Sequence, residues 1–519
     1  MASHGSARMP RRAVAAVAVA LAAPAATASA DPLTVAIHMV ADDGGGGQPA
    51  VSPLIGALTG PPEAVELPEL LATAIAASPD LAQVQVDLAI AADTIAAARA
   101  WDAWQVGADA QVGTDVVSTV AGDARSYAVT LSGDLTRRLS TGGLAGIHAT
   151  TGWSDTDRST SRYHHELTAT LAQPLLRGRG EELVRAAERS AAVARDATAL
   201  AGDAAAVAVV QEVVLAYFDL VQAERELGIR RASLELAQER LRVTDAGIAA
   251  GGVAASERIA VQQAIATRQE DILAGEVAVI EKSLALRRAT QLPIGPGQML
   301  LQTRADLAIP ARTWDTAALV EAARRWSPEA ARLRALEAGA TIEVEVDERG
   351  ILPSLDLGLS LGPAGTSDDP GSAAVDLITF DQFAAALSLS YRTSLGEVAA
   401  RATARSARAR REKVRIDAGD LDKQLALAVA RGVLAVEAAE RRHGLAVETI
   451  GLAERALAAE QARLASGKSR NVDVLQRQDE LRAAQLRQVQ AIVAWHRAAT
   501  TLAALTGELL PSYGVHVRR

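Results

Sequence analysis

The chain has 519 residues, a formal net charge of −9 and no cysteine, and only 3% of its residues are aromatic. Without cysteine it can form no disulfide, no thiolate metal site and no lipid-modified cysteine. The acidic balance gives no basic footprint for nucleic acid, so we expect no nucleic-acid partner. The sequence contains no P-loop, catalytic-triad or paired-carboxylate pattern, and we therefore expect no enzyme, no cofactor and no metal site.

Residues 1–30 have the pattern of a secretory signal peptide. Three arginines precede a short apolar run at residues 13–22, and the small residues 28–30 fit a cleavage site. That run is well short of the ~20 residues that a membrane span needs. No later stretch of span length is both apolar and uncharged. The sequence therefore predicts an exported protein without a transmembrane helix, which could cross a membrane only as a β-barrel.

Residues 31–62 are rich in glycine and proline, and we interpret them as a flexible leader. Helical patterning begins near Leu67 and continues to about Ala103. Within it, Ser78 and Pro79 predict the start of a second helix, because serine is a good N-cap and proline suits the first helical turn.

Four segments of alternating apolar and polar residues follow, at about residues 105–112, 126–135, 144–153 and 166–171. A period of two predicts strands with one apolar and one polar face. A soluble sandwich and a barrel in lipid would both show this pattern. Aromatic residues are concentrated in or beside the strand segments, which favours rows at membrane interfaces. The general preference of aromatic residues for strands is the other explanation.

A helical pattern without proline then covers residues 181–245, a length of nearly 100 Å at ~1.5 Å per residue. A glycine-rich break at 246–252 separates it from a second helix at 254–291, and residues 296–316 are interpreted as an irregular equatorial linker. The short helix before the strands and the helix after the break together nearly match the long helix in length. The sequence therefore predicts that both pack end to end along it.

The second half of the chain repeats this order. Its expected strands lie at 354–361 and 383–391, and its expected long helices at 398–465 and 471–506. One constant offset aligns Glu257 with Asp473 and Thr290 with Thr506, which indicates internal duplication. We therefore divide the rest of the chain into repeat 1 (63–295), repeat 2 (317–507) and a tail (508–519).

Several motifs, in this duplicated order, resemble the TolC-like outer-membrane efflux protein family over about residues 67–507. They are Ser-Pro-acid at 78–80 and 327–329, Gln-Pro-Leu-Leu-Arg-Gly at 173–178, Leu-Pro-Ser-Leu at 352–355, Arg-Leu-Ala-Ser-Gly at 463–467 and Asn-Val-Asp-Val-Leu at 471–475.

The resemblance implies an α+β membrane protein that forms a homotrimer. Duplicated long helical hairpins would build a periplasmic α-barrel, and each chain would contribute four strands to one shared transmembrane β-barrel. Four strands cannot close a barrel with an interior, so closure needs other chains. Residues 126–135 and 144–153 exceed the family's strand number, and either widen the barrel or lengthen an outer hairpin.

The function implied by the resemblance is a passive exit duct in the outer membrane of a Gram-negative bacterium, with a large periplasmic portion. It would contact outer-membrane lipid and serve tripartite efflux or type I secretion by docking to a periplasmic adaptor (membrane fusion) protein and an inner-membrane transporter. The sequence does not indicate the transported substrate. The alternative that the residues leave open is a periplasmic coiled-coil structural or adaptor-like protein with a soluble β domain.

The resemblance also implies that Asp473 lines a periplasmic constriction as part of a cation-attracting acidic ring, with Gln476 where the family often has a second acid. The other interpretation of Asp473 is a helix N-terminal acid favoured by the helix dipole. Glu257 would bond a basic residue at the entrance, supplied here by Lys468 or Arg470. Its other interpretation is an unpaired surface charge.

The two helix-to-helix turns are the implied docking tips for the adaptor. Glycines there permit tight turns after a helix. The implied tip residues are Gly251, Gly252, Arg463, Leu464, Ser466 and Gly467.

Overall fold

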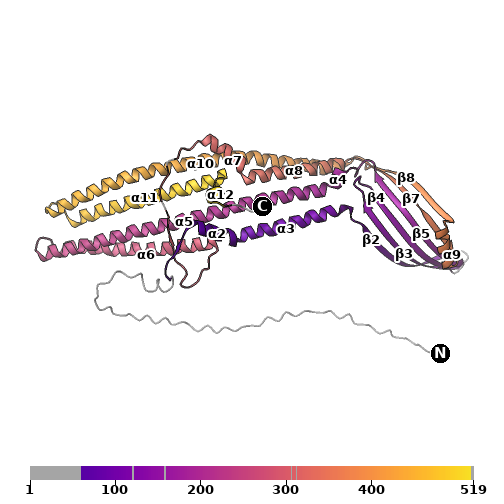
Figure 1. Cartoon of the computed structure of the whole chain (residues 1–519), viewed down its shortest axis with the longest axis horizontal. Coiled ribbons are helices and arrows are strands. Elements are labelled where there is room, and N and C mark those ends of the chain that lie inside the picture. Colours follow the sequence, from indigo (N-terminus) through magenta and orange to yellow (C-terminus); the bar gives the residue numbers. More distant parts are fainter. Residues whose placement is uncertain (1–59, 120–121, 157–158, 306, 311, 516–519) are drawn as a thin grey trace, which may run out of the picture. The chain divides into compact units, whose positions relative to one another are not determined.

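Strands from both repeats form a single sheet, and long helices run beside one another (Figure 1). The computed structural model describes residues 60–119, 122–156, 159–305, 307–310 and 312–515. All of them belong to one structural unit, Pro53–Arg519. The predicted signal peptide and nearly all of the predicted leader lie outside the described residues.

The large sheet has six strands in the order β2-β3-β4-β5-β7-β8, and every neighbouring pair is antiparallel. The strands are β2 (Gln105–Thr119), β3 (Gly122–Arg138), β4 (Leu144–Thr156), β5 (Ser159–Pro174), β7 (Ser354–Ser367) and β8 (Gln382–Arg392). All six segments that alternate in the sequence are therefore strands of this sheet, two more than the four that the family resemblance implies. The two additional segments, β3 and β4, are central members of the sheet, so they widen it.

The register separates an apolar face from a polar face, as the alternation predicts. Leu359 lies opposite Leu171 and Leu387, whereas the next residue, Ser360, lies opposite Thr170 and Ala386. Paired residues share a face, so the apolar positions form continuous rows across strands. All residues of β8 are exposed, and the apolar rows have no covering layer over most of the sheet within the described part of the chain.

The helices of repeat 1 are α2 (Leu67–Ala77), α3 (Pro79–Arg99), the short α4 (Glu181–Val184), α5 (Ala186–Ala249) and α6 (Ser256–Thr290), with the 3₁₀ turn η1 (Ala100–Asp102). Those of repeat 2 are α7 (Thr316–Trp326), α8 (Pro328–Arg349), α10 (Val398–Ala465) and α11 (Asn471–Thr506), followed by α12 (Leu509–Ser512). The predicted caps are confirmed in both repeats. The hydroxyl of Ser78 accepts from the backbone N–H of Leu81 (3.4 Å), and that of Ser327 from Ala330 (3.2 Å).

Each long helix carries two shorter ones along its length. Helices α3 and α6 pack on α5, and helices α8 and α11 pack on α10. The end-to-end arrangement predicted from the helix lengths is therefore confirmed. Helix α11 also packs on α5, which joins the two hairpins side by side.

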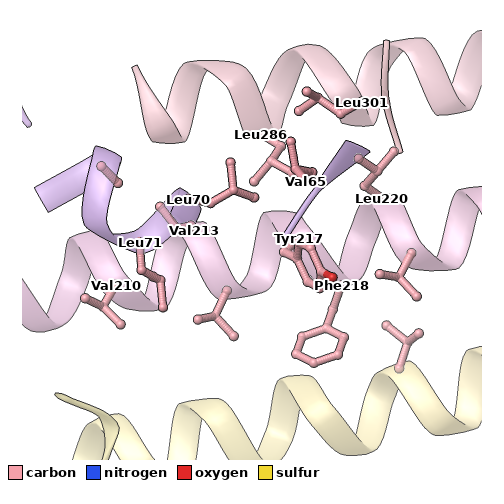
Figure 2. Packing of buried hydrophobic residues seen from close by; sticks show 14 of the residues in the cluster. Val65, Leu70, Leu71, Val210, Val213, Tyr217, Phe218, Leu220, Leu286 and Leu301 are labelled. Carbon is pink, nitrogen blue, oxygen red and sulfur yellow. The ribbon is translucent and has the colours of Figure 1, made fainter. Parts of the chain in front are cut away.

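The main hydrophobic core lies halfway along α5, where the helix meets α2 and α6. Figure 2 shows Leu71 and Leu286 converging on the α5 side chains around Val213. Phe218 points from α5 toward α11 and stacks on His496 with ring centroids 4.5 Å apart. Fully burying side chains of this size stabilises a fold by about 1.5–3 kcal/mol each, so this cluster fixes the mutual position of the two repeats.

Two short elements were not predicted from the sequence. Strand β6 (Leu301–Thr303), in the predicted linker, pairs in parallel with β1 (Glu63–Val65). Helix α9 (Pro370–Thr379) connects β7 to β8 and packs against β7 and β5. Among the described residues, the linker is thus partly ordered by pairing with the start of repeat 1.

Two helical segments, Leu67–Asp102 and Ala186–Ala249, are long and apolar enough to cross a membrane by length and composition alone. The first is divided at Ser78, where α2 ends and α3 begins. In the second, half of the most apolar window is buried inside the protein. Core helices of large proteins pass the same test, so neither segment is strong evidence for a helical span.

Candidate functional site at the hairpin tips

The two hairpin turns have the same backbone geometry. Gly251 and Gly467 have φ values of 74° and 73°, in the left-handed region that ends each long helix. The N–H of Gly251 donates to the carbonyl of Ile248 (3.0 Å), and that of Gly467 to Leu464 (2.9 Å). A side chain at either glycine would meet open space, so the backbone angle alone favours glycine there. All the implied tip residues are exposed except Leu464, which is half-buried.

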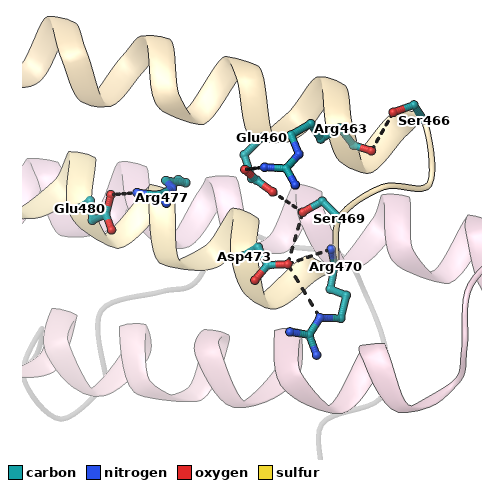
Figure 3. A network of polar contacts seen from close by, with 8 residues as sticks. All are labelled: Glu460, Arg463, Ser466, Ser469, Arg470, Asp473, Arg477 and Glu480. Carbon is teal, nitrogen blue, oxygen red and sulfur yellow. Dashed lines mark hydrogen bonds and ion pairs between the residues drawn. The ribbon is translucent and has the colours of Figure 1, made fainter.

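Asp473 lies in the first turn of α11 and caps that helix (Figure 3). Its Oδ2 accepts from the backbone N–H of Arg470 (3.1 Å) and from the hydroxyl of Ser469 (3.4 Å). The Nε of Arg470 lies 3.8 Å from the same oxygen. These contacts match the interpretation as a helix N-terminal acid. The side chain is still 41% exposed, so the carboxylate also remains in contact with solvent.

A second acid, Glu460, joins the end of α10 to the turn. The hydroxyl of Ser469 donates to Glu460, and Arg463 lies 3.4 Å from the other carboxylate oxygen. The hydroxyl of Ser466 donates to the carbonyl of Arg463 (2.9 Å). Figure 3 shows that Ser469 bridges Glu460 and Asp473. The sequence did not single out Glu460, because nothing local distinguishes it from other acids on a helix surface.

Glu257 connects the two hairpins. Its Oε2 accepts from the backbone N–H of Asn471 (3.0 Å), the first residue of α11. The side-chain amide of Asn471 donates to the hydroxyl of Thr244 (3.1 Å), and both of these side chains are buried. An acid of repeat 1 therefore caps a helix of repeat 2. The sequence placed Glu257 at the entrance but missed Asn471 as its partner, and Thr244 as the partner of the Asn471 side chain.

The basic residues predicted to bond Glu257 do not do so within the described chain. Arg470 pairs with Asp473 of its own helix, and no described ion pair joins Glu257 to Lys468 or Arg470. The amide of Gln476 donates to Glu480 one turn along α11 (3.3 Å). Within one chain, the structure therefore brings Glu257 together with the α11 N-terminus rather than with a basic side chain.

A second polar layer ties the hairpins together farther from the tips. The guanidinium of Arg268 on α6 is buried, donates to the carbonyl of Ser233 (3.2 Å) and pairs with Asp479 on α11 (3.2 Å). Arg482 then contacts both Asp479 (3.6 Å) and Asp271 of α6. A buried guanidinium needs such partners, because an unpaired buried charge is strongly destabilising. The layer fixes α6 against α11 directly behind the tips.

Comparison with known proteins identifies others with a similar sequence or a similar architecture. Residues 319–508 match the family of outer membrane efflux proteins. Curated protein sequences give no significant match. Among solved structures, the outer-membrane channel OprN superposes with a TM-score of 0.64 at 18% identity, over 85% of this chain and 90% of that chain.

Two further solved structures of outer-membrane proteins also superpose on most of this chain. The outer membrane protein VceC of Vibrio cholerae has a TM-score of 0.62 at 17% identity, over 85% of this chain and 96% of that chain. The open state of the MtrE outer membrane channel of Neisseria gonorrhoeae has a TM-score of 0.59 at 16% identity, over 85% and 89%. At such identities the likeness concerns the fold. Residues 319–508, which cover nearly all of repeat 2, are thus similar to outer membrane efflux proteins, and the chain as a whole shares the fold of these outer-membrane channels, as the resemblance to the TolC-like family predicts.

Proposed function

We propose that three copies of this chain form a passive exit duct through the outer membrane of a Gram-negative bacterium. The sheets would join into one transmembrane β-barrel, and the hairpins would form a tunnel in the periplasm. The duct would dock to a periplasmic adaptor and an inner-membrane transporter, for efflux of small molecules or for type I secretion.

The unclosed, apolar-faced sheet is the observation that carries this proposal. Its outer strands, β2 and β8, each have one edge without a partner in the described chain. Unpaired strand edges are unfavourable in lipid, because no water is present to bond the free N–H and C=O groups. Pairing β8 of one copy with β2 of the next would satisfy both edges and close a barrel.

Aromatic residues at both ends of the strands support a position in lipid. On β8, Phe383 and Tyr391 share the apolar face, with Leu387 and Leu389 between them. At ~3.4 Å per residue, the two rings are ~27 Å apart along the strand, or ~21 Å in height at a strand tilt of ~40°, which is close to an apolar band about 25 Å tall. Trp153 and Tyr163, which are paired on β4 and β5, extend the row at the Phe383 end.

The hairpin tips are the proposed entrance. Three copies of Asp473 around a threefold axis would form the acidic ring, with Gln476 one turn farther along α11. The exposed tip residues around Gly251, Gly467 and Arg463 would meet the adaptor. Glu257 would hold the start of α11, and hence Asp473, in place through its bond to Asn471. The exposed Lys468 and Arg470 would set the charge around the ring.

The alternative of a soluble periplasmic protein is less favoured by the same sheet. Large exposed side chains such as Val106, Leu387 and Leu389 are 81%, 74% and 65% accessible, and they lie in rows rather than singly. Contiguous apolar surface of this extent marks an interaction site or a membrane-facing surface. A soluble β domain would bury it in its own core.

Fractionation and mass measurement test the proposal. The mature protein should be found in the outer-membrane fraction and should require detergent to remain dispersed, as a particle with three chains per oligomer. In vivo cross-linking from a cysteine placed at Ser466 should capture an adaptor protein, whereas a cysteine at the exposed β8 position Ser388 should not. A monomer that stays in solution without detergent would refute the duct.

A further inference from the structure

Helix α9 is the one helix that packs on the apolar face of the sheet in the described part of the chain. The face follows from the register. Gly365 lies opposite His165, His165 lies opposite Thr151, and Thr151 lies opposite Leu131. The neighbouring Thr366 instead bonds His164 across the polar face, with Oγ1 3.0 Å from Nδ1. Gly365 therefore faces the same side as Leu131.

A close backbone contact holds α9 on that side. A Cβ atom at Gly365 would collide with the carbonyl oxygen of Ala373 and approach the backbone nitrogen of Leu377. Ala373 is fully buried and Gly365 is buried as well. The missing side chain at Gly365 is thus what lets the helix lie against the strand. The helix contacts β7 and β5, so it leans toward the interior of the sheet and away from the free edge of β8.

The opposite side of α9 is apolar and uncovered. Val375 and Ile378 are 56% and 74% exposed, and the helix contains no basic residue. Ser372, which is exposed, lies one turn before Val375 at the polar start of the helix and bonds Asp369. An uncovered apolar helix side beside an apolar sheet face marks an interaction or membrane-facing surface.

The uncovered side is continuous with the proposed lipid-facing surface. Phe380, which ends the helix in the left-handed conformation, stacks on Phe383 of β8 with ring centroids 6.3 Å apart. Phe383 belongs to the aromatic row at this end of the strands. A second copy joined at the β8 edge would not reach Ile378, since α9 lies over β5 and β7. Continuity with the apolar strand face therefore favours lipid as the occupant.

We propose that α9 is a lipid anchor that inserts Val375, Ile378 and Phe380 among the acyl chains at the external edge of the bilayer. The inference rests on the proposed function, because it requires the apolar face of the sheet to meet lipid. The anchor would fix the depth of the barrel and hold the β7–β8 connection down on the outer surface of the barrel, away from its lumen.

Single-cysteine spin labelling tests this directly, because the native chain has no cysteine to remove. Nitroxides are attached to Ile378→Cys and, as a control at the polar start of the same helix, to Ser372→Cys. Both proteins are reconstituted as the full oligomer in phosphatidylethanolamine–phosphatidylglycerol vesicles. Relaxation is measured with oxygen, which concentrates in acyl chains, and with a water-soluble nickel chelate. The label at 378 should respond to oxygen and lose its response to nickel, and the label at 372 should show the reverse.

A label at Leu131→Cys, in the middle of β3, separates failure of the anchor from failure of the duct. If 131 responds to oxygen while 378 responds to nickel, the barrel stands and the anchor is refuted. If 378 responds to neither probe, a protein surface covers α9 and the anchor is again refuted. If 131 itself responds to nickel, both proposals fail. Gly365→Val should push α9 off the sheet and move the 378 label toward nickel, while the 131 label stays unchanged.

Discussion

Asp473 combines a structural contact with the charge that the proposed ring requires. Only Oδ2 takes part in the capping contacts of α11, and the side chain is partly exposed. Closely spaced carboxylates repel one another and attract divalent cations. One residue can therefore close the helix end and set ion preference at the same time.

Asp473→Asn should change ion selectivity without changing the fold. The amide oxygen can still accept the capping bonds, and an exposed substitution of this kind usually alters stability by less than ~0.5 kcal/mol. Single-channel recordings in planar bilayers should show loss of cation preference and weaker block by multivalent cations. Asp473→Glu, which keeps the charge, is the control. Intact oligomers with unchanged selectivity would leave Asp473 with its capping role alone.

Glu257→Ala should loosen the start of α11. The substitution leaves the backbone N–H of Asn471 without its partner, at a cost of about 1–3 kcal/mol where water cannot replace it. Hydrogen exchange should become faster for the amides of residues 471–475 and stay unchanged at the core around Val213. Glu257→Gln retains an acceptor and should protect these amides better than alanine. Equal exchange rates in the native protein, Glu257→Ala and Glu257→Gln would show that the bond between the hairpins does not stabilise the start of α11.

Glu224 gives the helical region a pH dependence of defined sign. Burial raises the pKa of its carboxyl group, although Thr303 donates to it from its backbone N–H (3.0 Å) and its hydroxyl. A raised pKa means that the folded state binds the proton more tightly than the unfolded state. The folded state therefore loses stability as pH rises from the ordinary glutamate pKa through the raised one, and the loss is complete above it.

Glu224→Gln should consequently unfold at a higher temperature than the native protein near neutral pH, because it removes a half-buried charge and keeps an acceptor for Thr303. The difference in unfolding temperature should shrink in acid, below the ordinary pKa of glutamate. Thermal unfolding of the detergent-solubilised proteins, followed by circular dichroism near neutral pH and in acid, measures this difference. A lower midpoint for the variant at neutral pH would mean that the charged hydrogen bonds outweigh the cost of burial.

At the scale of secondary-structure elements, the sheet can be tested by comparing two adjacent residues of β7. Leu359→Arg places a charge on the face proposed to meet lipid, at a cost of ~2–4 kcal/mol per chain near mid-bilayer. Ser360→Arg places it on the polar face and should be mild. The yield of oligomer in the outer-membrane fraction should fall sharply for the first variant only. Similar yields would mean that the two faces are assigned the wrong way round.

The sequence predicted those faces because alternation is a local property. It also predicted the long helices, their breaks at Gly251 and Gly467, and the caps at Ser78 and Ser327, since each depends on neighbouring residues. The sequence also predicted all six strand segments, although the family resemblance implied only four strands per chain. The position of β3 and β4 depends on pairing between distant segments, which periodicity does not determine.

Other elements escaped prediction for similar reasons. Strand β6 is three residues long, too short to show a period, and exists because β1 lies beside it. Helix α9 shows no clear helical pattern in the sequence, because Pro, Gly and aromatic residues surround it. Its position depends on the missing side chain of Gly365, a contact between segments that the sequence does not reveal. The bond from Glu257 to Asn471 joins two hairpins, so neither hairpin alone reveals it.

At the scale of the whole molecule, three copies of a six-stranded sheet would make a barrel of eighteen strands. Deleting residues 120–158 would remove β3 and β4 and join the end of β2 to the start of β5, with the antiparallel direction kept. The shortened chain should still assemble as a trimer, with a narrower exit. Polymer exclusion from the sheet side of single channels should show a smaller size limit. An unchanged limit in assembled trimers would mean that the two strands do not enlarge the opening.

In the proposed trimer, the two additional strands would alter how the electrical resistance is distributed along the duct. Barrel diameter grows roughly linearly with strand number, so eighteen strands give an opening ~1.5 times as wide as twelve. A pore of that width offers little resistance to ions, and the tips lie in series with it. The voltage applied across the whole duct would then fall almost entirely at the ring of Asp473. Opening and closing at the periplasmic end would therefore appear as nearly all-or-none steps in current, and antibiotics entering from outside would reach the tips unhindered before any discrimination began.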